Sequence, residues 1–230
     1  MQTHFIRRTS TADELAEALR TRILSGEMLP GSTLLEIPLS EAFGVSRNTL
    51  REAMRILILE GLLKRRIHRG VTVAELSPAD VAEIYALRRM LELKAVALAG
   101  RATRQDFSHM SKAVTDFQVA ALSRDWAAAV DADMRFHTAL VALHRSPRLL
   151  HFYRKVVGEL RLGMVLVDRA HDNPRRLIPQ HKAMLKALEA RRLKECAQML
   201  SRHLDDSERR LQSIFGSKHD MKQKAAIAAD

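Results

Sequence analysis

Four side chains in the C-terminal part of this 230-residue chain could together bind a metal ion. Asp133 and His137 lie four residues apart, which places both on one face of a helix. His181 and His203 each lie on an apolar stripe with helical spacing. One carboxylate and three imidazoles from three helices suit Zn, Ni, Fe or Mn, and an octahedral shell leaves positions open. Each histidine alone is more often an ordinary hydrogen-bonded residue, so the prediction depends on the three segments converging.

A second group of chemically informative residues is basic and lies between positions 47 and 70. This segment contains seven Lys or Arg residues and only two Glu. Gly44 can form a left-handed turn, and Ser46 can cap the helix that follows it. Apolar residues recur along that helix at helical spacing: Leu50, Met54, Leu57 and Ile58. The opposite face carries Arg47, Asn48, Arg51 and Arg55. This pattern indicates a buried stripe with a basic face exposed to a polyanion.

The elements expected around this basic face form a helix-turn-helix with a wing. We predict a short first helix over residues 40–43, capped by Ser40, and a second helix that ends at Gly61. Leu62–Leu63 and Val71–Val73 would pair as a hairpin around residues 64–70. In such folds the N-terminal residues of the second helix enter the DNA major groove. The alternative is an ordinary helical hairpin with a solvated basic face.

The rest of the chain predicts a separate helical domain. Ser77, Pro78 and Asp80 mark a helix start, so we divide the chain into residues 1–75 and 76–215, with 216–230 as a flexible tail. The fold class is therefore mainly α: an N-terminal winged helix-turn-helix with a small β-hairpin wing, followed by a C-terminal antiparallel bundle of about six helices. The helices are expected over residues 78–100, 104–123, 125–145, 147–169, 174–190 and 192–215.

The overall composition supports a polyanionic partner but does not locate its site. The formal net charge is +11, of which +2 falls in residues 1–75 and +9 in residues 76–230. Cys196 is the single cysteine, so no intrachain disulfide is possible, and we expect a buried structural thiol. The N-terminus lacks an apolar signal segment, and no run approaches the ~18 apolar residues of a membrane span. We expect a cytoplasmic protein with no membrane partner.

The segment GVSRNTLREAMRILILEGLL, followed by RG, resembles the winged-helix domain of the GntR family of bacterial transcription regulators. The resemblance covers about residues 10–75. It implies that Arg47 and Arg51 meet bases or phosphates, that Thr49 lies on the DNA backbone and that Gly70 lets the wing tip approach the minor groove. Asn48 stands where the family often has Thr, so the operator sequence does not transfer from a relative. The full predicted DNA-binding set is Arg47, Asn48, Thr49, Arg51, Arg55, Arg69 and Gly70.

Residues 78–215 resemble the FCD-type effector domain of the FadR-like branch of this family. Metal-binding members carry Asp-x3-His, then a His before two apolar turns, then His-Leu near the end of the last helix. Asp133, His137, His181 and His203 match these positions in order. In the segment YALRRMLE the resemblance makes Arg88 the candidate effector-binding residue, and the alternative is a solvated surface arginine. One departure is the turn at residues 144–147, where many relatives have Ser-Gly-Asn.

These features together predict a DNA-binding transcription regulator rather than an enzyme. We expect a homodimeric repressor that binds a two-fold symmetric double-stranded operator and responds to a small organic or sugar acid. The metal would be a divalent transition metal, with Zn expected in the isolated protein. Two alternatives remain open: a constitutive DNA-binding regulator whose metal is structural, and a metal-dependent enzyme that activates water at the open positions.

Overall fold

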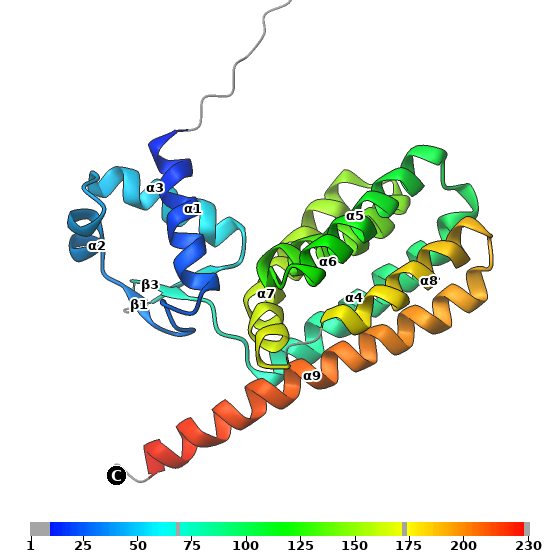
Figure 1. Cartoon of the computed structure of the whole chain (residues 1–230). Helices are drawn as coiled ribbons and strands as arrows, with labels where there is room; N and C mark the ends of the chain where they lie inside the picture. Colours follow the sequence, from blue (N-terminus) through cyan, green and yellow to red (C-terminus); the bar gives the residue numbers. More distant parts are fainter. Residues whose placement is uncertain (1–9, 68–69, 172–173, 228–230) are drawn as a thin grey trace, which may run out of the picture. The chain divides into compact units, whose positions relative to one another are not determined.

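The computed structural model describes residues 10–67, 70–171 and 174–227 (Figure 1). The chain separates into two compact units, Met1–Glu75 and Leu76–Asp230.

The N-terminal unit combines three helices with a small antiparallel sheet. Its elements are α1 (Thr11–Leu24), β1 (Thr33–Leu34), α2 (Glu36–Ala42), α3 (Arg47–Leu59), β2 (Leu63–Arg66) and β3 (Gly70–Val73). The strand order is β1-β3-β2, with Thr33 opposite Thr72 and Leu63 opposite Val73. The predicted wing hairpin is therefore confirmed as β2 and β3, and β1 adds a third strand beside β3.

The helix-turn-helix forms where the turn and cap residues predicted it. Gly44 has a φ of 63°, the left-handed conformation that glycine adopts most easily, and it separates α2 from α3. The backbone N–H of Thr49 donates to Ser46 Oγ at 3.1 Å, which caps α3. Leu50, Met54 and Leu57 on α3 are buried, and α3 packs against α1. The basic face of α3 is thereby turned away from the core.

The predicted start of the first helix of this motif was wrong. The helix α2 begins at Glu36 rather than Ser40, with Leu35 at its N-cap and no side-chain cap bond. Ser40 lies buried inside α2 and donates its hydroxyl to the Ile37 carbonyl at 2.9 Å. Pro38 sits in the first turn, where its missing N–H has no intrahelical partner to lose.

The C-terminal unit is a helical bundle. Its main helices are α4 (Pro78–Leu98), α5 (Arg104–Leu122), α6 (Trp126–Val141), α7 (Pro147–His171), α8 (Ile178–Glu189) and α9 (Leu193–Ile227), with short 3₁₀ segments η1 (Ala99–Arg101), η2 (Ala142–His144) and η3 (Pro174–Leu177). Helix α5 packs along α6, α4 along α9, and α8 against both α5 and α9 (Figure 1). Capping boxes start α4 at Ser77 and α5 at Thr103.

The last helix extends further than the sequence predicted. Helix α9 continues to Ile227, through a segment in which we expected a frayed tail. Gly216 does not end the helix, and the Lys, Gln and Ala residues that follow it have high helix propensity. Cys196 on α9 is buried, and this burial raises the pKa of its thiol to about 12. In the described part of the chain, no helix is long and apolar enough to cross a membrane.

Candidate functional site

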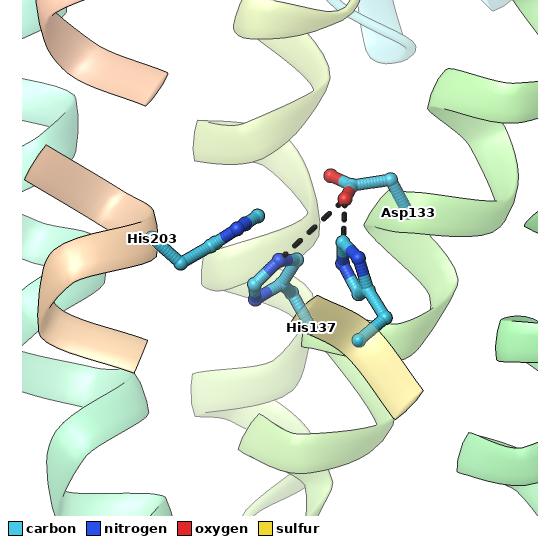
Figure 2. A group of neighbouring side chains, drawn as sticks. Asp133, His137 and His203 are labelled. Atoms are coloured by element: carbon cyan, nitrogen blue, oxygen red, sulfur yellow. Dashed lines mark ion pairs between the residues drawn. The ribbon is translucent and has the colours of Figure 1, made fainter. Parts of the chain in front are cut away.

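The structure brings the four predicted metal ligands together in the core of the bundle. Helix α6 carries Asp133 and His137 one turn apart, α8 carries His181 and α9 carries His203. All four are buried, with exposed fractions of 4% or less. One potential ligand atom from each residue lies within 4.8 Å of the others. Figure 2 shows the side chains of Asp133, His137 and His203 pointing toward one another.

Hydrogen bonds to the outer ring nitrogens fix the tautomers of the three imidazoles. Each Nδ1 contacts an acceptor: His137 contacts Glu92 Oε2 (2.6 Å), His181 the Leu177 carbonyl (3.0 Å) and His203 Gln180 Oε1 (3.0 Å). A carbonyl or carboxylate oxygen accepts, so each Nδ1 carries the hydrogen and each Nε2 has a lone pair in the neutral ring. Metal-binding histidines in proteins are commonly held in this way. Burial and the charges of His181 and His137 lower the pKa of His203 well below its ordinary value, which favours the neutral ring.

The inner atoms of the cluster are acceptors that face one another. Asp133 Oδ1 lies 2.8 Å from His181 Nε2 and 3.8 Å from His137 Nε2. Among the described residues, these two nitrogens and both Asp133 oxygens have no partner in hydrogen-bond geometry, although the 2.8 Å contact is short enough for an ion pair. Two acceptors this close repel unless a proton or a cation lies between them. Metal–ligand distances of about 2.0–2.1 Å place neighbouring ligand atoms roughly 2.9 Å apart in an octahedral shell and roughly 3.3 Å apart in a tetrahedral one, so the residues fit a metal ion.

Asp133 supplies the negative charge of the cluster. Burial alone would raise the pKa of this carboxyl, but the neighbouring imidazoles of His137 and His181 outweigh burial and lower the pKa. The carboxylate is therefore the anionic member of a set with three imidazoles. That composition suits a divalent first-row metal better than Mg²⁺ or Ca²⁺, which prefer all-oxygen shells.

Sequence reasoning missed Glu92, a fully buried carboxylate behind the cluster. Besides His137 Nδ1, Glu92 accepts from Arg88 Nε at 2.7 Å and from the Tyr153 hydroxyl at 2.7 Å. Burial would raise the pKa of Glu92, but the charges of Arg88 and His137 lower it to about 2. The four-residue spacing of Arg88 and Glu92 was a signal that the sequence analysis did not use.

Arg88 itself lies in the interior of the bundle and is only 2% exposed, so the alternative of a solvated arginine is excluded. Its guanidinium carbon lies 5.0 Å from the centre of the Tyr85 ring, a cation–π distance. Glu92 contacts both Arg88 Nε and His137 Nδ1, so Arg88 lies one side chain away from the cluster. A buried cation beside the cluster can attract an anion that reaches it.

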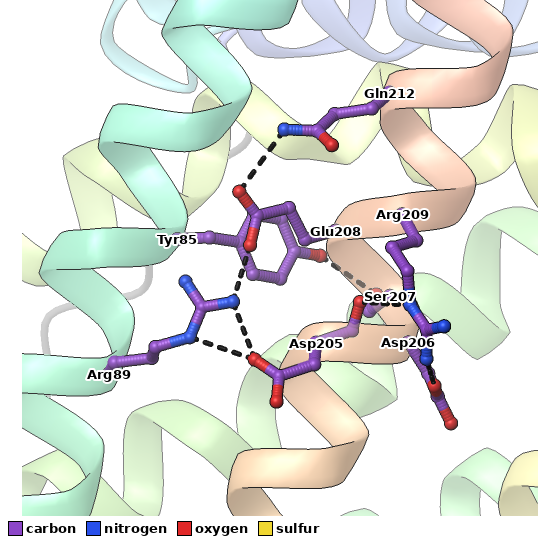
Figure 3. Close-up of polar contacts among 8 residues, drawn as sticks. All are labelled: Tyr85, Arg89, Asp205, Asp206, Ser207, Glu208, Arg209 and Gln212. Atoms are coloured by element: carbon purple, nitrogen blue, oxygen red, sulfur yellow. Dashed lines mark hydrogen bonds and ion pairs between the residues drawn. The ribbon is translucent and has the colours of Figure 1, made fainter.

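Polar contacts join α4 to α9 (Figure 3). Arg89 donates to Asp205 Oδ1 at 3.0 and 2.7 Å and also contacts Glu208. The buried Tyr85 hydroxyl donates to Ser207 Oγ at 2.8 Å. These contacts hold the helix that carries Arg88 and Glu92 against the helix that carries the fourth ligand. Helix α4 also begins directly after the boundary between the two units.

The described residues of the bundle line a larger and a smaller surface cavity. One of about 580 Å³ lies between α5, α6 and α7 and includes none of the four ligands in its lining. The other, of about 370 Å³, lies between α8 and α9 and is lined by Gln180 and His203, with Arg202 and Asp206. The second cavity therefore borders the ligand cluster, although it is smaller. It is the relevant cavity because His203, a predicted metal ligand, lines it.

The predicted DNA-binding residues on α3 lie largely in solvent. Arg47, Asn48, Arg51 and Arg55 are exposed, and Thr49 is half-buried with its hydroxyl 2.9 Å from Ser46 Oγ. Arg51 donates to Glu36 on α2 at 2.9 Å, and this hydrogen bond with the Glu36 charge raises the pKa of Arg51. The structure thus groups the α3 residues on one accessible face.

The wing contributes a glycine at the start of β3. Gly70 has a φ of 70°, and a Cβ there would meet nothing within 4 Å, so backbone conformation rather than space favours glycine. Arg65 and Arg66 on β2 are exposed beside it. Arg69, also predicted to contact DNA, lies outside the described residues.

Comparisons with known proteins agree with this architecture. Residues 11–73 match the family described as bacterial regulatory proteins, gntR family, and residues 83–206 match the FCD domain. The chain belongs to the GntR family, with an FCD domain. It is accordingly a DNA-binding transcription regulator and not an enzyme.

Relatives that align with most of this chain support its membership of the GntR family. The gluconate operon transcriptional repressor of Bacillus licheniformis is 26% identical over 218 residues, covering 92% of this chain and 89% of the relative. The galactonate operon transcriptional repressor of Escherichia coli K12 is 25% identical over 233 residues, covering 88% and 97%. A crystal structure of a putative GntR regulator from Rhodococcus sp. RHA1 superposes with a TM-score of 0.74 at 31% identity, covering 89% and 99%.

Proposed function

We propose that this GntR regulator is a repressor whose operator binding is controlled by a small carboxylate bound at a metal ion in the FCD domain. The observation that carries the proposal is the pair of facing acceptors, Asp133 Oδ1 and His181 Nε2, 2.8 Å apart in the buried core of the bundle. Burying two facing acceptors costs free energy unless a cation lies between them. A bound cation would both remove this cost and give the regulator a site for an anionic ligand.

Asp133, His137, His181 and His203 would hold the metal, a divalent ion chosen from Zn, Ni, Mn and Fe, with Zn expected in the isolated protein. When bound, the ion supplies a positive charge and open coordination positions suited to a carboxylate. Glu92, Gln180 and the Leu177 carbonyl keep the imidazoles oriented through their Nδ1 hydrogens. Arg88 is paired with Glu92, so beside the cluster it offers a directional hydrogen-bond donor for a carboxylate oxygen, while the metal supplies the net positive charge.

Two relatives support an organic or sugar acid as the effector. Their names describe repressors of a gluconate operon and of a galactonate operon, and both compounds are sugar acids. The cavity between α8 and α9 that borders His203 offers such a molecule a route to the cluster. A bound metal and a buried arginine would recognise its carboxylate, and the hydroxyl groups would remain for selectivity.

The DNA-binding half of the proposal rests on the exposed face of α3 and on the wing. Two chains would pair as a homodimer and present two recognition helices to a two-fold symmetric operator, with half-sites about one helical turn apart. The proposed contacts are Arg47, Asn48, Thr49, Arg51, Arg55, Arg69 and Gly70. The effector would favour an arrangement in which the two helices no longer match the half-sites, because a ligand shifts only an equilibrium between states that it binds unequally.

The test begins with a duplex selected by the wild-type protein from a random-sequence library. Fluorescence anisotropy then measures binding of this duplex to the Zn-loaded protein with gluconate or galactonate at increasing concentration. We expect at least one of the acids to release the wild-type protein, and neither to release the His181→Ala variant or chelated protein. DNA binding that is unchanged by every acid in the Zn-loaded wild type would refute effector control and favour a constitutive regulator with a structural metal.

A further inference from the structure

The interior of the FCD domain holds very few charged groups. Among its described residues, the buried acidic and basic side chains are Arg88, Glu92, Asp133, His137, His181 and His203. The imidazoles are neutral when they act as metal ligands, because each ligating nitrogen must be deprotonated. The protein therefore contributes one positive and two negative charges to a region shielded from water.

The carboxylate of Glu92 offsets the positive charge of the Arg88 guanidinium, and so reduces the attraction of Arg88 for an anionic ligand. Its Oε1 atom accepts from Arg88 Nε and from the Tyr153 hydroxyl, both at 2.7 Å, and its Oε2 atom lies 2.6 Å from His137 Nδ1. Three donors around one carboxyl group leave no acceptor for a Glu92 proton, so Glu92 is a carboxylate. Its negative charge compensates the guanidinium 2.7 Å away, and Arg88 contributes a directional donor but little net charge.

The remaining charges set the balance of the site. Asp133 cancels one charge of a divalent cation, so the region with its metal carries a net charge of about +1. At the mouth of the cavity bordering His203, Arg202 and Asp206 have opposite charges, so this rim adds no net charge. One bound carboxylate would bring the buried charge to zero.

We infer that the effector of this site is a monocarboxylate, and that Glu92 enforces this selectivity over dicarboxylates and sugar phosphates. The inference rests on the proposed metal-dependent effector site and names its ligand class. A second carboxylate or a phosphate dianion would bring a negative charge toward Glu92 and Asp133, and among the described residues no further buried cation is available to pair with it. Glu92 is a positioning residue here: it acts through Arg88 and His137 rather than by touching the effector.

The test compares acids that share a carbon chain and differ by one carboxylate. Zn-loaded full-length protein is titrated with gluconate and glucarate, and with galactonate and galactarate, while thermal unfolding is followed. Zinc content is measured after each titration, so that removal of the metal by a diacid is not mistaken for weak binding. We expect the monoacid of at least one pair to raise the melting temperature, with the matching diacid at least about tenfold weaker in apparent affinity.

Two variants separate charge from hydrogen bonding. Glu92→Gln removes one buried negative charge and should narrow or reverse the preference for the monoacid. Tyr153→Phe removes one hydrogen bond to the same carboxylate without changing the charge, and should keep the wild-type preference. If Glu92→Gln does not fold, the comparison within the wild type still decides whether the site prefers a monocarboxylate.

The outcomes distinguish this inference from the proposal on which it rests. A diacid that binds the zinc-loaded wild type as tightly as its monoacid would overturn monocarboxylate selectivity and leave metal-dependent control standing. An equal preference in Glu92→Gln and the wild type would overturn the role of Glu92. The absence of a shift with all four acids would overturn both the sugar-acid effector and this inference.

Discussion

Removing the metal should destabilise the helical domain, because the cluster geometry leaves its ligand atoms without partners. Four buried ligand atoms on Asp133, His137 and His181 have no partner in hydrogen-bond geometry among the described residues. Each buried polar atom left unsatisfied costs about 1–3 kcal/mol, so the metal-free cluster is strained by several kcal/mol. We therefore expect chelation to lower the melting temperature of the FCD domain.

The size of the shift follows from mass action. A metal at about 100 times its Kd stabilises the folded state by about 2.7 kcal/mol. For a domain of about 150 residues, 1 kcal/mol corresponds to roughly 2–4 °C in melting temperature. The expected drop on adding a chelator is therefore about 5–10 °C, and adding back Zn should restore the original value.

Circular dichroism melts of the wild type and two variants test this reasoning. In Asp133→Asn the amide can donate to His181 Nε2, so the variant should lose most of the metal-dependent shift and, without metal, should melt at or above the wild type. Arg51→Ala, in the other domain, serves as the control and should keep the full shift. A wild-type melting temperature that neither chelator nor Zn changes would refute the argument from the facing acceptors.

Three further predictions concern other parts of the chain. Arg51→Ala should weaken operator binding by about 1–3 kcal/mol if the residue reads a base, and wild-type affinity in an Arg47→Ala, Arg51→Ala double variant would contradict the proposed docking of α3. Ser46→Ala should destabilise the winged-helix domain by about 1 kcal/mol in chemical denaturation, and no change would show that the α3 cap contributes little. The hydrogen bond from Arg145 lowers the pKa of Asp106, so this pair stabilises the fold above about pH 4 and the contribution is lost on acidification. Arg145→Ala should reduce that acid-dependent loss by no more than about 1 kcal/mol, measured as unfolding free energy at pH 6 and pH 3, and an unchanged pH slope would contradict it.

The sequence predicted helix starts and turns correctly where a capping side chain or a glycine determines them. Ser77 with Asp80, and Ser46 alone, form the predicted caps, and Gly44 forms the predicted turn. The start of α2 was missed because Leu35 offers no side-chain cap to detect. Ser40 looked like a cap because serine favours helix starts, yet it is equally tolerated inside a helix when its hydroxyl bonds to a preceding carbonyl.

The candidate site was predictable only in its inner part. Apolar spacing could place His181 and His203 on the inward faces of their helices, and the four-residue spacing could pair Asp133 with His137. Helical periodicity could not show which residues of different helices meet behind the ligands. The contacts of Glu92 with His137, 45 residues away, and with Tyr153, 61 residues away, arise only from the packing of α4, α6 and α7. The structure was therefore needed to show which residues hold the four predicted metal ligands in place.

The most direct test of the account is the metal content of the purified full-length protein, measured by elemental analysis beside an Asp133→Ala, His181→Ala double variant. The account predicts about one transition-metal ion per chain in the wild type and none in the double variant. Absence of metal from the wild type, even after incubation with Zn, Ni and Mn, would contradict it. The four residues would then be a polar cluster of the bundle core, and the effector would bind without a metal.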